Sequence, residues 1–158
     1  MRLVRLVSSV LTAFGVLFCA LPRIAFGAPP DPCALLTDSQ VSAALGVSTI
    51  SGKSTGGRIC RWAGPGGRPG VSPALVLTIQ DARAFDFAKA PTNSPSLVKT
   101  PASGVGDDAV FNTVGIVTAT LTVKKGDTYF EVHVYGFPVE RTKTIEKTIA
   151  QEVVSRLK

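Results

Sequence analysis

His133 is the only histidine in the chain, so it is the natural candidate for an imidazole general base. Glu131 lies two residues away, and on a strand both side chains would share one face, where the carboxylate could orient the ring. A Ser–His–acid hydrolase also needs a nucleophile on a sharp turn and an oxyanion site, and no segment of the sequence has these features. The sequence favours a hydrogen-bonded histidine on a polar surface, with a small hydrolase using His133 as the alternative.

Two short motifs match catalytic patterns only in part. Gly52-Lys53-Ser54 resembles the end of a phosphate-binding loop, but Val47 stands where the first glycine of that motif belongs. Ser96-Leu97-Val98-Lys99 matches the Ser-x-x-Lys of penicillin-binding enzymes, and the companion motifs of those enzymes are missing. We therefore expect neither chemistry.

Two groups of polar residues are candidates for binding instead. Alternation along a predicted strand places four of them on one face: Tyr129, Glu131, His133 and Tyr135. Three arginines lie around glycine-rich loops: Arg58, Arg61 and Arg68. The arginines could meet an anionic ligand of the cell envelope, and a solvated rim is the simpler interpretation.

The first 27 residues have the pattern of a cleavable signal peptide. Arg2 and Arg5 precede an apolar run that is short for a membrane span, and Ala25-Phe26-Gly27 places small residues where a signal peptidase reads them. We expect cleavage before Ala28, so that residues 28–158 form a single exported domain, periplasmic or secreted, with no stable transmembrane span. An uncleaved membrane anchor is the alternative.

Cleavage would change both the charge and the cysteine content. The formal net charge would fall from +6 to +3, which gives no support to nucleic-acid binding. Cys19 would be removed, and the bulky Phe18 before it disfavours processing as a lipoprotein anchored at Cys19. The remaining pair, Cys33 and Cys60, would meet an oxidising compartment, which predicts a disulfide. Two cysteines and one histidine are too few for a zinc site, so we expect no metal and no cofactor.

Hydrophobic periodicity predicts the elements that carry these residues. A capping box, Thr37 to Gln40, should start a helix that ends at Gly46, and residues 140–158 should form an amphipathic helix with the stripe Ile145, Ile149, Val153 and Leu157. Strands are expected near 59–62, 74–79, 109–112, 115–124 and 128–137, with a short helix near 81–88. Val117, Ala119, Leu121 and Val123 should face the core, and Trp62 should pack on the disulfide. These elements predict an α+β fold, an antiparallel sheet of about five strands with an N-terminal and a C-terminal helix on one face.

Several segments together resemble a known family. These are Asp31-Pro32-Cys33-Ala34-Leu35-Leu36-Thr37, Cys60-Arg61-Trp62 and Gly104-Val105-Gly106-Asp107-Asp108-Ala109. The pattern resembles small exported actinobacterial lipoproteins of domain-of-unknown-function family 3558 and, more remotely, the extracellular sensor domains of mycobacterial serine/threonine kinases. The resemblance implies an α+β domain with its two cysteines bonded, and no reaction.

These observations predict a noncatalytic cell-envelope domain that binds a ligand or a protein partner through the Tyr129/Glu131/His133/Tyr135 face or the glycine-rich loops. The alternatives are the hydrolase using His133 and a structural envelope subunit, which would show an exposed apolar patch. The partner, the ligand and the oligomeric state do not follow from the sequence.

Overall fold

The computed structural model describes residues 29–66 and 71–157 of the 158-residue chain. The expected signal peptide (1–27), its cleavage site before Ala28, Cys19 and Arg68 lie outside these residues. The elements follow along the chain in the order η1 (Pro32–Ala34), α1 (Asp38–Leu45), β1 (Lys53–Thr55), β2 (Ile59–Ala63), β3 (Ala74–Asp81), η2 (Ala82–Ala84), α2 (Phe85–Lys89), β4 (Leu97–Pro101), β5 (Asp108–Val114), β6 (Thr118–Lys125), β7 (Thr128–Tyr135) and α3 (Val139–Arg156).

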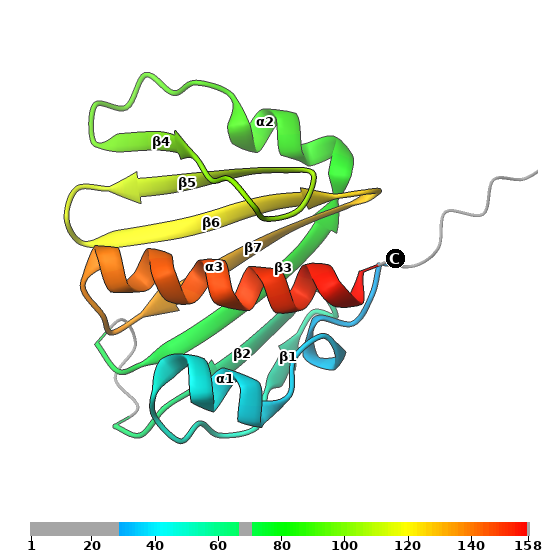
Figure 1. The fold of residues 1–158 in the computed structure, drawn as a ribbon, viewed down its shortest axis with the longest axis vertical. Helices are drawn as coiled ribbons and strands as arrows, with labels where there is room; N and C mark the ends of the chain where they lie inside the picture. The colour runs from blue at the N-terminus through cyan, green and yellow to red at the C-terminus, as the bar shows by residue number, and fades with distance from the viewer. Residues whose placement is uncertain (1–28, 67–70, 158) are drawn as a thin grey trace, which may run out of the picture.

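The strands form one antiparallel sheet in the order β1-β2-β3-β7-β6-β5-β4 (Figure 1). The α+β class is confirmed, but the sheet has seven strands where about five were expected. The two additional strands, β1 and β4, are its edges. All three residues of β1 are exposed, so this strand has no apolar alternation to reveal it. β4 follows a proline-rich stretch and itself ends at Pro101, a residue that sheets tolerate at edges.

The predicted β2–β3 hairpin and the β5–β6–β7 meander are both present. Ala119, Leu121 and Val123 of β6 are fully buried, as the alternation predicts. Val117 was expected beside them and is 79% exposed. The chain turns after β5 and the strand begins only at Thr118, so Val117 belongs to the turn and not to the pleat.

The N-terminal helix begins and ends where the sequence predicts. The Thr37 hydroxyl accepts from the Gln40 amide, and the Gln40 side chain accepts from the Thr37 amide, so two otherwise unpaired N–H groups are satisfied. Gly46 ends the helix at a φ of 69°, a left-handed conformation that glycine adopts without a Cβ penalty.

Helices α1 and α3 cover the same face of the sheet, as predicted (Figure 1). The stripe on α3 is buried at Ile145, Ile149 and Val153, which pack with the inward-facing residues of the central strands, whereas Leu157 lies just beyond the helix and is half-buried. The short α2 contributes to the opposite face, where Phe85 packs edge-on against Tyr129. Within the described residues, no helix is both long enough and apolar enough to cross a membrane.

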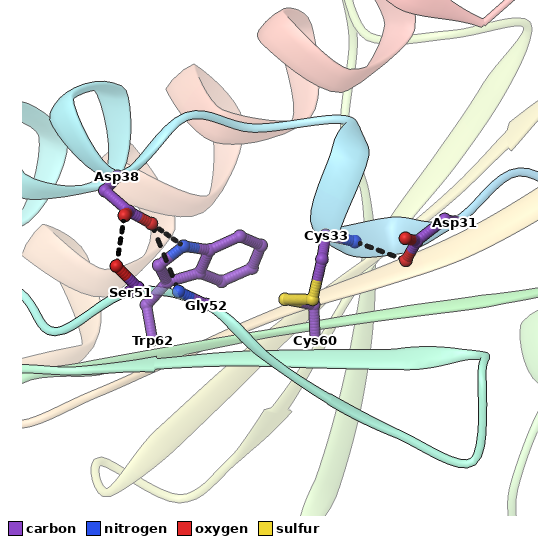
Figure 2. The surroundings of a disulfide bond; sticks show 7 residues. All are labelled: Asp31, Cys33, Asp38, Ser51, Gly52, Cys60 and Trp62. Carbon is purple, nitrogen blue, oxygen red and sulfur yellow. Dashed lines mark hydrogen bonds between the residues drawn. A yellow bond between two sulfur atoms is a disulfide. The ribbon is translucent and has the colours of Figure 1, made fainter.

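The predicted disulfide joins Cys33 to Cys60 and so ties the N-terminal segment to β2 (Figure 2). Trp62 lies beside it and is fully buried, as expected. Its indole N–H donates to Asp38 Oδ1 at 2.9 Å, and the same carboxylate accepts from the Ser51 hydroxyl and the Gly52 amide. The first turn of α1, the segment before β1 and the indole are thereby held together next to the disulfide.

Candidate functional site

The four polar residues of β7 share the sheet face opposite α1 and α3. This follows from the burial of the alternate residues Phe130, Val132 and Val134 in the helix-covered core. Glu131, His133 and Tyr135 are half-buried, but Tyr129 is only 3% exposed. Tyr129 was expected to belong to a binding surface, but it is closed off from solvent because Phe85, which begins α2, covers it.

A hollow of about 440 Å³ lies on this face. It is lined by residues of β3, β4, β5, β6 and β7, including Glu131, His133 and Tyr135. Because β3 and β4 are separated by three strands in the sheet, their joint contribution shows that this face is concave. The volume is in the range of about 300–1,000 Å³ that is typical of small-molecule pockets. The structure thus places three of the four predicted face residues in one cavity, which we call the β-face pocket.

His133 lies in the β-face pocket between two partners. Its ring stacks on that of Tyr135, with 4.0 Å between the ring centroids and 26° between the planes. Its Nε2 shares a hydrogen bond with Thr118 Oγ1 at 2.9 Å. Burial lowers the pKa of His133 below its ordinary value of 6.5, so the ring is neutral at pH 7.

Glu131 is fixed by the buried Tyr129. The Tyr129 hydroxyl donates a short hydrogen bond to Glu131 Oε1. Burial and this bond to the carboxylate both raise the pKa of Tyr129, so the phenol stays protonated and remains a donor. The contact orients Glu131 at the edge of the pocket.

Uncharged polar side chains form another part of the wall. Thr78 and Thr120 line the pocket, and among the described residues neither hydroxyl makes a hydrogen bond. The Asn112 side-chain amide donates to the Thr122 hydroxyl at 2.9 Å. The Asn112 Oδ1 atom is buried and has no hydrogen-bond partner among the described residues. The pocket therefore presents hydroxyl groups whose bonding capacity is unused.

Sequence reasoning missed Glu146, which is fully buried on α3. The pairing of β6 with β7 ends at Leu121 and Val132. The backbone amide of Val134, which lies beyond this end and next to His133, donates to Glu146 Oε1 at 3.1 Å. Burial raises the pKa of Glu146 to about 9, so the carboxyl is protonated at pH 7. A helical-phase analysis would have found it, because residue 146 lies between the buried positions Ile145 and Ile149 on the inward face.

Arg58 and Arg61 are not part of the pocket. Arg61 is exposed on β2 and Arg58 is exposed in the turn before it, and neither lines the hollow. Among the described residues, no group of three or more His, Cys, Asp or Glu side chains could hold a metal ion. The chain matches no protein-family model and no curated protein.

Proposed function

We propose that the protein is an exported, noncatalytic domain of the cell envelope that binds a ligand in the β-face pocket. The observation that carries this proposal is the concave hollow of about 440 Å³ lined by Glu131, His133 and Tyr135. A hollow of this size, in which a few polar side chains stand among apolar and aromatic ones, is typical of binding sites. Support for export comes from the signal-peptide pattern of residues 1–27 and from the disulfide of the domain.

An amide-shift experiment tests the binding function. The isotope-labelled protein is titrated with fractionated envelope extract, and the backbone amides are followed by NMR. We expect shifts concentrated at pocket residues such as Thr120, His133 and Tyr135, with none at Thr148 of α3, a helix that covers the opposite face of the sheet. Shifts that avoid the pocket, or an absence of shifts with every fraction, would show that the hollow is not a binding site.

One contact favours the hydrolase alternative. Thr118 Oγ1 lies 2.9 Å from His133 Nε2, the geometry of a nucleophile next to its base, although the partner is a threonine and not the serine of a Ser–His–acid arrangement. Among the described residues, no carboxylate hydrogen-bonds to the second ring nitrogen of His133, so the orienting acid of a triad is missing.

The two functions differ in a simple assay. A noncatalytic domain releases no p-nitrophenol from p-nitrophenyl esters above the background given by Thr118→Val. Turnover that disappears in both Thr118→Val and His133→Gln would instead establish the hydrolase.

A further inference from the structure

The chemistry of the β-face pocket indicates what it binds, an inference that rests on the binding function proposed above. We infer that the ligand is neutral and polyhydroxylated, a saccharide of the cell envelope, whether free or part of a glycan polymer. The charges, the hydrogen-bonding groups and the rings of the lining residues all favour such a ligand.

The charges of the pocket disfavour an ionic ligand. Among the described lining residues Glu131 alone carries a formal charge, and it already accepts from the Tyr129 hydroxyl. Lys53 and Arg61 continue the cross-strand row of His133 beyond β3, but both are exposed. Lys99 pairs with Asn112 on the other side, but its ammonium donates to two backbone carbonyls near the end of α2. An anion would find no cationic partner in the lining, and a polyamine would find only one carboxylate.

The hydrogen-bonding groups of the pocket match hydroxyls. A threonine hydroxyl both donates and accepts, as does the hydroxyl of a sugar, so each can satisfy the other. The unused hydroxyls of Thr78 and Thr120 lie on β3 and β6, on either side of β7, and the neutral His133 adds a further polar group. An apolar ligand would leave these groups desolvated and unpaired, which costs free energy.

Rings and apolar side chains supply the remaining contacts. The Tyr135–His133 stack forms part of the lining, near the apolar side chains of Val76, Leu97 and Val114. Aromatic faces are electron-rich, and the C–H groups on the faces of a sugar ring carry slight positive charge. A pyranose can therefore pack its C–H face on this apolar part while its hydroxyls reach the threonines.

The test compares probes of different charge by amide-shift NMR on the purified protein. The neutral probes are methyl glucoside, methyl mannoside, N-acetylglucosamine and cellobiose; the charged probes are inorganic phosphate and spermidine. A second arm uses purified envelope polysaccharide, which separates a polymeric source from a free sugar. We expect pocket amides to shift with at least one neutral sugar or with the polysaccharide, and not with phosphate or spermidine.

Variants connect the binding to the pocket. Thr120→Val keeps the side-chain shape and removes an unused hydroxyl, so the affinity for the bound sugar should fall roughly fivefold. Thr100→Val, at an exposed position of β4, is the matched control and should bind like the wild type. Equal affinity of Thr120→Val and the wild type would overturn the inference.

The outcomes separate the ligand class from the binding function. Pocket shifts with phosphate, with spermidine or with envelope fractions, but with no neutral sugar or polysaccharide, would overturn the saccharide class and leave the binding function standing. Pocket amides that respond to no probe and to no envelope fraction would overturn both.

Discussion

Glu146 should make the stability of the domain fall as the pH rises. Its carboxyl is fully buried, Oε1 accepts from the Val134 amide, and burial raises its pKa to about 9 from an ordinary value of 4.5. Between these two pH values the folded chain holds a proton that the unfolded chain has released, so unfolding releases a proton and is favoured by rising pH. Below pH 4.5 the carboxyl of Glu146 is protonated in both the folded and the unfolded chain, so it no longer makes the free energy of unfolding depend on pH.

The magnitude follows from the raised pKa. Each pH unit between 4.5 and about 9 removes about 1.4 kcal/mol from the free energy of unfolding, so the loss between pH 5 and pH 8 is about 4 kcal/mol. This is a large part of the roughly 5–15 kcal/mol that stabilises an ordinary domain. Glu146→Gln keeps an oxygen acceptor for Val134 and removes the titration. Glu146 Oε2 is buried without a hydrogen-bond partner, so the wild type already has an unsatisfied polar group at this position. In Glu146→Gln the side-chain NH₂ takes the place of that group.

The assay is urea unfolding at a series of pH values, followed by the fluorescence of Trp62, the only tryptophan. We expect Glu146→Gln to be about 3 kcal/mol more stable than the wild type at pH 7, with a flatter dependence on pH. Glu140→Gln, on the same helix with a side chain 86% exposed, is the control and should keep the wild-type slope. A wild-type stability that does not change from pH 5 to pH 8, or a Gln variant that keeps the slope, would refute the reasoning.

Three further predictions concern the disulfide cluster. Replacing Cys33 and Cys60 together by alanine opens a link between residues 27 apart and should cost about 3–4 kcal/mol in urea unfolding. Free thiols in the wild-type protein, seen by mass analysis without reductant, would contradict the bond. Gly52→Ala places a Cβ 2.7 Å from the Trp62 ring and 2.8 Å from Cys60 Sγ, so it should lower the free energy of unfolding by about 1–3 kcal/mol. An unchanged urea midpoint would contradict tight packing around Gly52. The hydrogen bonds from Ser51, Gly52 and Trp62 lower the pKa of Asp38 in the folded protein. The ionised Asp38 therefore stabilises the fold above its unfolded-state pKa of about 3.9, and this stabilisation is lost as the pH falls through the folded-state pKa. Asp38→Asn should therefore reduce the acid dependence of the Trp62 fluorescence transition, and an unaltered acid limb would argue against this role.

Local signals in the sequence were sufficient for much of the fold. The capping box at Thr37, the left-handed Gly46 and the stripe on α3 act within a few residues of chain, so they could be read directly. The pairing of Cys33 with Cys60 followed from the removal of Cys19 with the expected signal peptide, and the bond is present.

The rest depended on contacts between distant segments. Edge strands β1 and β4 form because a neighbouring strand offers unpaired backbone groups, and their own residues carry little periodicity. The alternation on β7 predicted that Glu131, His133 and Tyr135 share a face, but not that the sheet is concave or that Phe85 covers Tyr129. Those features arise from sheet curvature and helix placement, which no single segment encodes.

Blocking the β-face pocket tests its role as a binding site most directly. Thr120 pairs with Asn112 across β5 and β6 and lines the hollow with His133, so the ring of Thr120→Phe would occupy the hollow. Wild-type protein and the exposed control Thr100→Phe are compared with it for retention of envelope ligand, after circular dichroism has shown that all three are folded. The ligand should be retained by the wild type and the control and lost by Thr120→Phe; equal retention by all three would contradict a binding function for the pocket.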